Sequence, residues 1–164
     1  MATQIAHARG GVIGARWLDA ADYHITLRFV GDVDARAAQE IAEALDGIRR
    51  PPARVAFEGL SWFGGDKPRS IVARVRADSA LIDLQAEQER RLRRIGLATE
   101  TRKFLPHVTL ARLRGVGAAA VADYLDSRGG LKVEAFIAER FVLFSAREGS
   151  GGGPYVVEAA YPLG

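Results

Sequence analysis

Cysteine is absent from the 164 residues of this chain. Disulfide bonds, thiolate metal sites and cysteine nucleophiles are therefore excluded, and the composition fits a reducing compartment. The sequence also lacks a hydrophobic run long enough to span a bilayer, and its first residues lack the charged-then-apolar layout of a secretory signal. We therefore expect a cytoplasmic protein with no membrane partner. A P-loop and a dinucleotide-binding fingerprint are missing as well, so neither of these nucleotide sites is expected.

What is present is the composition of an ordinary globular domain, with 48% hydrophobic and 26% charged residues. The net charge is only +3, but 20 of the 23 basic residues are arginine. The planar guanidinium group matches phosphate oxygens, so this excess weakly favours phosphate ligands. A composition rich in alanine, glycine and arginine also arises from codon bias, and that explanation stays open.

One tetrapeptide pattern occurs twice, as His24-Ile25-Thr26-Leu27 and as His107-Val108-Thr109-Leu110. The chain has three histidines, and composition alone gives Thr and Leu at these positions after a given His with a probability of about 0.003. Because side chains alternate along a strand, the His and Thr of each copy share one face while the aliphatic residues take the other. Each copy can therefore present an imidazole and a hydroxyl to a cleft.

A pair of histidines suits the hydrolysis of a phosphodiester without a metal. A neutral imidazole removes a proton from water, an imidazolium protonates the departing oxygen, and the threonine hydroxyls donate to non-bridging oxygens. A single histidine on such a strand is more often structural, whereas two in identical motifs favour catalysis. No metal or other cofactor is expected, because two histidines without a carboxylate cluster form a poor ligand set. His7, which lies outside the motif, is interpreted as a surface residue.

Hydrophobic periodicity predicts alternating helices and strands. Helices are expected at 3–9, 34–48, 79–96 and 118–125, with Ser79 as the N-cap of the third. Strands are expected at 16–30, 55–63, 70–75, 107–113, 132–144 and 155–160, the last two around a loop at 148–153.

The two motifs lie 83 residues apart, about half the chain, and each is placed on a strand. We interpret this spacing as an α+β fold, one domain spanning residues 1–164 with two similar lobes related by a pseudo-two-fold duplication. Two antiparallel sheets are expected to line a central cleft, with the helices outside. In this arrangement the two histidines come from opposite halves of the molecule and straddle one anion.

The residues around both motifs carry a family resemblance. The segment Leu27-Arg28-Phe29-Val30-Gly31-Asp32-Val33 and the segment Arg102-Lys103-Phe104-Leu105-Pro106-His107-Val108-Thr109-Leu110-Ala111-Arg112 resemble the two-histidine (2H) phosphoesterase superfamily. The nearest match is the RNA 2′,3′-cyclic phosphodiesterase family, historically called 2′-5′ RNA ligases. The resemblance implies a bilobal α+β fold and metal-free hydrolysis of 2′,3′-cyclic phosphates to 2′-phosphates. The expected partners are RNA 3′ ends or small cyclic nucleotides.

The resemblance also implies roles for the motif residues. His24 would protonate the leaving 3′ oxygen and His107 would act on water, although motif order alone leaves the two roles interchangeable. Thr26 and Thr109 would hold the phosphate.

Arg112 matches a position that family members use near the phosphate. Its offset of five from His107 places it on the opposite face of a regular strand, so either the strand bulges after Thr109 or Arg112 reaches the site around an edge. The alternative is a solvent-facing strand residue. Phe29 holds the same offset after His24 and is interpreted as a core residue. Trp62 and Phe63 precede a glycine-rich loop and either stack on nucleobases or pack in the core or between the lobes.

One departure from the family pattern concerns the start of the chain. Family members usually begin with a strand and a full helix before the segment matching Arg16 onward, whereas only a helix-like 3–9 segment precedes it here. A missing strand would uncover a sheet edge, so self-association through that edge is expected. Two other functions stay open: an RNA-end binding module with little turnover, and a cyclic phosphodiesterase acting on ADP-ribose cyclic phosphate or another small substrate.

Overall fold

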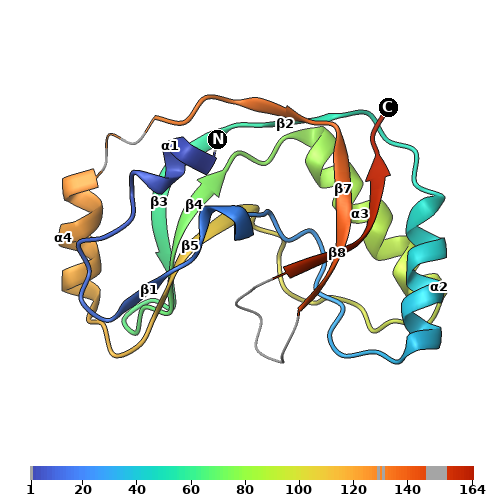
Figure 1. Cartoon of the computed structure of the whole chain (residues 1–164), viewed down its shortest axis with the longest axis horizontal. Coiled ribbons are helices and arrows are strands. Elements are labelled where there is room, and N and C mark those ends of the chain that lie inside the picture. The colour runs from blue at the N-terminus through green and yellow to red at the C-terminus, as the bar shows by residue number, and fades with distance from the viewer. Residues whose placement is uncertain (1, 129, 131, 147–154) are drawn as a thin grey trace. The chain divides into compact units, whose positions relative to one another are not determined.

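The computed structural model describes residues 2–128, 130, 132–146 and 155–164, so the loop predicted at 148–153 lies outside the described residues. The chain divides into two compact units, each assembled from three segments (Figure 1). The first unit contains Met1–Ile25, Ala56–Arg76 and Pro106–Phe136, and the second contains Thr26–Val55, Ala77–Leu105 and Ile137–Gly164. Helices and antiparallel strands occur in both units, which confirms the α+β class. The pseudo-two-fold relation stays a prediction.

A four-stranded antiparallel sheet organises the first unit. Its strand order is β1 (Ala15–Trp17), β5 (His107–Leu113), β4 (Ser70–Val75) and β3 (Phe57–Phe63). The same unit holds the helices α1 (Ala2–Ala6), η1 (Ala20–Asp22) and α4 (Ala118–Arg128). The strand β5, which carries the second motif, has the bounds that the sequence predicted and lies in the interior of the sheet.

One face of this sheet builds the hydrophobic core of the first unit. On β5, the side chains of Val108, Leu110 and Ala111 are fully buried in this core, together with Ile71 on β4. Ile5 of α1 and Val121 of α4 cover them. Burying one face of β5 leaves its polar motif side chains for the opposite face.

The β3–β4 hairpin turns at a position that only glycine fits. Gly64 directly follows Phe63 and has φ +113°, and a Cβ placed on it would lie 2.3 Å from the Lys67 carbonyl oxygen. The turn closes where the Arg69 N–H donates to the Phe63 carbonyl over 2.7 Å. This geometry fixes the end of β3 and therefore the direction of the Phe63 side chain.

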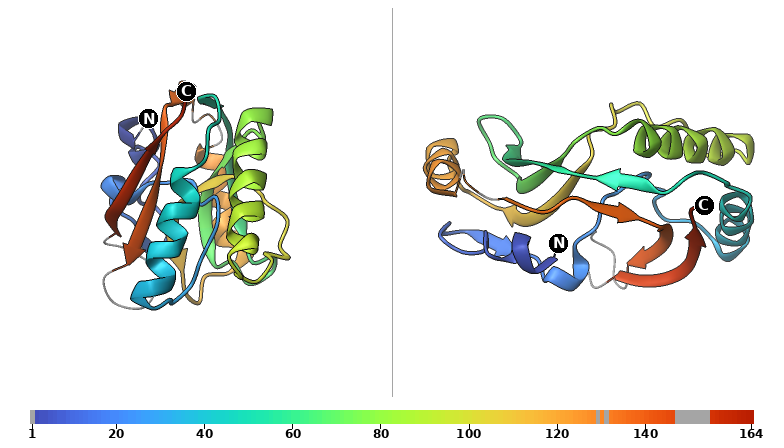
Figure 2. Two further views of the ribbon diagram at one scale, coloured as in Figure 1. Left: turned by 90° about the vertical axis from the view of Figure 1, so that its right-hand side faces the viewer. Right: turned by 90° about the horizontal axis from the view of Figure 1, so that it is seen from above.

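The second unit packs two helices against a hairpin. The helices are α2 (Ala35–Asp46) and α3 (Ser79–Arg94), and the strands β7 (Arg140–Ala146) and β8 (Tyr155–Pro162) pair antiparallel. The helices α2 and α3 lie side by side, and α2 also touches β8 (Figure 2). The short strands β2 (Ala53–Val55) and β6 (Phe136–Ala138) form a further pair.

Both long helices begin at an aspartate. The Asp34 carboxylate accepts from Ala37 N–H at the start of α2, as expected for an N-cap. At the start of α3 the capping group is the Asp78 carboxylate, which accepts from Ala80 N–H. The prediction of Ser79 as the cap is therefore wrong by one residue, because the carboxylate one position earlier takes that bond.

The longest predicted strand, at 16–30, is wrong over most of its length. The chain leaves the sheet after β1, because the Asp19 carboxylate caps the short helix η1 by accepting from Ala21 N–H. It returns for a single bridge at Ile25. From there on Leu27 and Val30 pack on the core of the second unit. The strand predicted at 132–144 is likewise two strands, β6 and β7.

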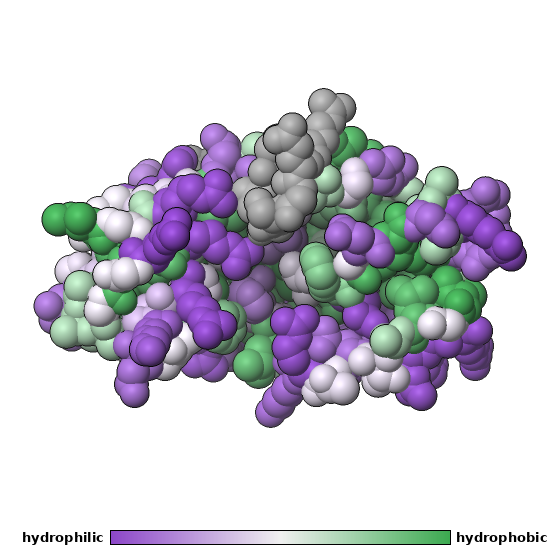
Figure 3. Space-filling model, turned by 90° about the horizontal axis from the view of Figure 1, so that it is seen from below, coloured by the Kyte–Doolittle hydropathy of each residue, from purple (hydrophilic) through white to green (hydrophobic). Residues whose placement is uncertain are grey.

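The surface mixes polar and apolar side chains. On the face drawn in Figure 3, hydrophobic side chains form separate groups among hydrophilic ones. Phe29 is 63% exposed, so the prediction that it is a core residue is wrong. Among the helices of the described residues, none combines the length and the apolar character needed to cross a bilayer.

Candidate active site

The two motifs meet at their second residues. Ile25 forms an antiparallel bridge with Val108, and these are the equivalent positions of the two copies. Two residues paired in this way are related by a local two-fold axis that passes between them. One step along each strand from the Ile25–Val108 bridge, His24 therefore lies opposite Thr109. Val108 is buried in the first core and Ile25 packs against it, so alternation turns His24, His107 and Thr109 to the other face.

This register brings the two histidines together within one unit. They occupy a diagonal of the antiparallel pair, for which the Cα atoms are roughly 7–8 Å apart. Both belong to the first unit. The expectation that the histidines come from opposite halves of the molecule is therefore wrong, because His24 lies at the end of one segment of this unit and His107 lies on its central strand.

A backbone hydrogen bond orients the His24 ring. Its Nδ1 lies 2.7 Å from the carbonyl oxygen of Asp22. A carbonyl oxygen only accepts, so Nδ1 carries the proton and donates, and Nε2 is the nitrogen that gains or loses a proton. Asp22 is the last residue of η1, whose start is capped by Asp19. The Asp19–Asp22 turn thus fixes both the position and the tautomer of His24.

An aromatic contact orients the His107 ring. The Phe63 ring meets it nearly edge to face, with 4.7 Å between the ring centroids and 79° between the planes. Phe63 lies at the end of β3 and His107 at the start of β5, and in the strand register Val72 of β4 lies midway between them. Val72 is fully buried although it points away from the first core. The two rings therefore converge over the sheet, a role of Phe63 that the sequence alone did not reveal.

Replacing Phe63 by leucine tests this contact. We expect the ring resonances of His107 to shift in NMR spectra, because the ring current of Phe63 disappears, while those of His24 change less. The stability should fall by about 0.5–1.5 kcal/mol, the value of an aromatic pair beyond its buried area. Phe63→Tyr, which keeps the ring, is the matched control. Unchanged His107 resonances in Phe63→Leu would show that the two rings are apart in solution.

A β-bulge determines which face Arg112 takes. Val72 pairs with Thr109 and the adjacent Ile71 pairs with Ala111, so one step on β4 spans two residues of β5. The extra residue is Leu110, and both Leu110 and Ala111 are buried. The next residue, Arg112, is exposed on the face of His107 and Thr109. Of the two routes predicted for Arg112, the bulge is confirmed.

Thr109 lies opposite His24 and two residues after His107 on this face, half-buried on β5. Thr26 directly follows Ile25 and is the first residue of the second unit, where its side chain is exposed. The structure thus brings His24, His107, Thr109 and Arg112 to one face of one sheet, while the position predicted for Thr26 stays a prediction.

A network of charged side chains in the second unit holds the segments next to both motifs. The Arg28 guanidinium lies 2.6 Å from Glu89 and 4.0 Å from Glu100, and it also donates to the Ala98 carbonyl. Hydrogen bonds from Arg102 lower the pKa of the Glu100 carboxyl to about 2. Arg28 follows the first motif along the chain and Glu100 precedes the second, so within the second unit this network joins the segment after one motif to the segment before the other.

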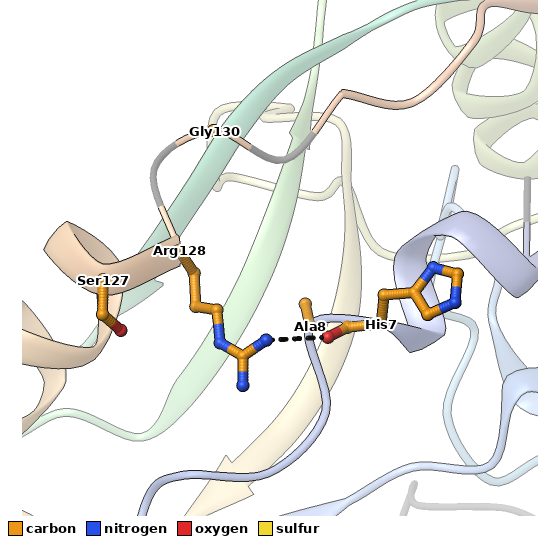
Figure 4. Close-up of a pocket in the computed structure, with 5 residues that line it drawn as sticks. All are labelled: His7, Ala8, Ser127, Arg128 and Gly130. Carbon is orange, nitrogen blue, oxygen red and sulfur yellow. Dashed lines mark hydrogen bonds between the residues drawn. The ribbon is translucent and has the colours of Figure 1, made fainter.

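Two hollows of the surface are lined by residues outside the motifs. One, of about 230 Å³, is lined by His7, Ala8, Ser127, Arg128 and Gly130. There the Arg128 guanidinium donates to the His7 carbonyl over 3.1 Å, while the exposed His7 ring points away (Figure 4). The prediction of His7 as a surface residue is confirmed. In the part of the chain that the structure describes, no three His, Asp or Glu side chains group as a metal site would require.

Comparison with family models identifies the family. The model described as LigT like Phosphoesterase matches residues 2–72 and 75–155, which include both motifs. The chain belongs to this family. The resemblance found in the sequence is therefore confirmed.

Named relatives of this LigT-like phosphoesterase share part of its length. An RNA 2′,3′-cyclic phosphodiesterase of Aeropyrum pernix is 37% identical over 115 residues, which cover 68% of this chain and 65% of the relative. A protein of the same name from Geobacillus stearothermophilus is 33% identical over 99 residues, 58% of this chain and 32% of the relative. A third, from Aquifex aeolicus, is 27% identical over 157 residues, 93% of this chain and 84% of the relative. The chain thus spans less than two thirds of the first two relatives.

Solved structures share the fold of this LigT-like phosphoesterase. TT0787 of Thermus thermophilus superposes with a TM-score of 0.80 at 18% identity, covering 99% of this chain and 89% of that one. Escherichia coli LigT complexed with 3′-AMP gives a TM-score of 0.74 at 20% identity, covering 99% and 90%.

Proposed function

We propose that this LigT-like phosphoesterase hydrolyses 2′,3′-cyclic phosphates of RNA or nucleotides to 2′-phosphates, with two histidines as acid and base and without a metal. The observation that carries the proposal is the bridge between Ile25 and Val108, which brings the two motifs into register on one face. The relatives named RNA 2′,3′-cyclic phosphodiesterase support the choice of substrate.

The reaction needs one proton removed and one supplied. The neutral ring takes a proton from water as the water oxygen bonds to phosphorus, and the protonated ring gives its proton to O3′ as the P–O3′ bond breaks. The products are a 2′-phosphate and a free 3′ hydroxyl. We assign the proton donor to His24, following the family pattern. The hydrogen bond from its Nδ1 to the Asp22 carbonyl leaves Nε2 for the proton transfer in either role.

Hydroxyl and guanidinium groups would stabilise the charge that develops on phosphorus. The Thr109 hydroxyl, opposite His24 in the register, is proposed to donate to a non-bridging oxygen. Thr26 would do the same from the first motif, since it lies two residues after His24. Arg112, which the bulge turns to this face, would add positive charge on the substrate side of the sheet.

The proposal is tested with an oligonucleotide ending in a 2′,3′-cyclic phosphate. We expect the product to carry its phosphate on O2′, and kcat/KM to follow a bell-shaped pH profile, because one ring must be neutral while the other is protonated. Rates should persist in the presence of a chelator. Strong inhibition by the chelator, or a product with a 3′-phosphate, would contradict the mechanism.

The partners proposed are RNA 3′ ends or small cyclic nucleotides. Escherichia coli LigT has been crystallised with 3′-AMP, with ATP and with NADP+, so a protein of this fold accommodates nucleotides. Equal rates on cyclic mononucleotides and oligonucleotides would instead favour a small-molecule substrate, such as ADP-ribose cyclic phosphate. Binding without any product would favour an RNA-end binding module. Self-association through a sheet edge stays a prediction; the edge strands of the first sheet are β1 and β3.

A further inference from the structure

Two arginines lie directly opposite each other beside the motif residues. In the β1–β5 ladder, Arg16 pairs with Arg112. The chain neighbours of Arg16 are Ala15 and Trp17, and both pack against the first core. The Arg16 side chain therefore points to the opposite face of the sheet. Both arginines are exposed there. Arg16 is thus on the same face as His107 and Thr109.

Like charges in directly opposed positions destabilise an antiparallel pair. Arg74, on the same face, shows how such a charge is usually compensated: its guanidinium lies 3.6 Å from the Glu58 carboxylate. For Arg16, the described residues supply no carboxylate within ion-pair distance. An anion beside Arg16 would relieve this repulsion and gain a charge-assisted contact.

The strand register gives the spacing of this pair from the histidine site. Thr109 pairs with Val72 and Arg112 pairs with Ser70. Measured along β4, the row of residues that contains Thr109 and the row that contains Arg112 are therefore two residues apart. At about 3.4 Å per residue this is about 7 Å along the strand. Successive phosphates of an extended single-stranded nucleic acid have a comparable separation. A phosphate held at Thr109 would therefore place its neighbour near the row of Arg16 and Arg112.

We infer that Arg16, with Arg112, binds the phosphodiester one nucleotide upstream of the reacting cyclic phosphate. This inference rests on the proposed function and narrows its substrate. An oligonucleotide end would gain contacts that a cyclic mononucleotide lacks, so it is the better substrate. The ligand of the pair is an internal phosphate of RNA, and free inorganic phosphate is the competing source of the same chemistry.

The test compares three substrates in three proteins. The substrates are a cyclic mononucleotide, a dinucleotide ending in a 2′,3′-cyclic phosphate, and the same dinucleotide with a neutral methylphosphonate linkage. The proteins are the unchanged chain, Arg16→Gln and Arg54→Gln. Arg54 is a matched control, because it is also the exposed middle residue of a three-residue strand, β2.

In the unchanged chain we expect kcat/KM to be about tenfold higher for the charged dinucleotide than for the neutral one, as one charge-assisted contact provides. Arg16→Gln should remove most of this ratio, and Arg54→Gln should retain it. The salt dependence of dinucleotide binding should also weaken by about 0.7 in slope in Arg16→Gln, since one phosphate contact is lost.

The outcomes separate this inference from the function on which it rests. Turnover of the mononucleotide with no preference for the charged linkage would overturn the inference and leave the proposed function intact. A preference that persists in Arg16→Gln would also overturn it. If millimolar inorganic phosphate inhibits turnover of the mononucleotide and of no other substrate, the protein has one anion site and no second one, which also overturns the inference. If no substrate is turned over, the proposed function fails and the inference fails with it.

Discussion

Replacing either His24 or His107 by alanine is expected to lower kcat/KM by about 100-fold to 10,000-fold, the usual contribution of a positioned acid or base. In the proposed mechanism each ring has one proton transfer to perform. The measurement is hydrolysis of a 2′,3′-cyclic phosphate at several pH values. The double variant should lose little more than the worse single variant, because the two residues act as a unit.

The same variants distinguish the two roles. A general acid must be protonated, so its loss removes the fall in rate at high pH; a general base must be neutral, so its loss removes the fall at low pH. We expect His24→Ala to lose the alkaline limb and His107→Ala to lose the acidic limb. The opposite pattern would exchange the roles. His7→Ala is the matched control, since His7 is exposed and lies outside the motifs. Near-normal turnover in either motif variant would refute the pairing.

The second large expected effect is a loss of stability when the core beneath the motifs is truncated. Leu110 is fully buried on β5 at the bulge, and Leu110→Ala should lower the free energy of unfolding by about 2–5 kcal/mol, because it removes buried methyl groups and leaves a cavity. Domains of this size are stable by only about 5–15 kcal/mol. Urea denaturation measures the loss.

The matched control for this prediction is Ile13→Ala in the same unit. Ile13 is 98% exposed, so its truncation should change the free energy of unfolding by less than about 0.5 kcal/mol. Similar losses in the two variants would mean that β5 does not lie in a packed core in solution.

Local signals predicted much of the fold. The period of the apolar residues placed α2 and α3, and the alternation after Pro106 placed β5 with its observed bounds. These elements were predictable because the apolar period of each, and the residues that cap the helices, lie within a few positions in the sequence. The prediction of one strand at 16–30 failed because different parts of that segment contact different parts of the structure. Its first part pairs with β5, Asp19 then caps η1, and Leu27 packs on the second core.

The position of Arg112 shows the same limit at the site. Two routes for it were predicted from the sequence, and only the pairing of β4 with β5 decided between them, because a bulge is a property of two strands. Phe63 is a similar case. Its contact with His107 joins residues 44 positions apart in number, and no pattern around either residue encodes it.

The sequence by itself determined the proposal for the chemistry, since two copies of one tetrapeptide carry the imidazoles and hydroxyls that acid–base catalysis uses. It also determined the α+β class and the family. The tertiary structure decided which strands pair, and hence that His24 and His107 share a diagonal of one antiparallel pair within one unit. The physical reason is that side-chain identity and periodicity are local, whereas register depends on the burial of Ile25 and Val108 in a core built from distant segments.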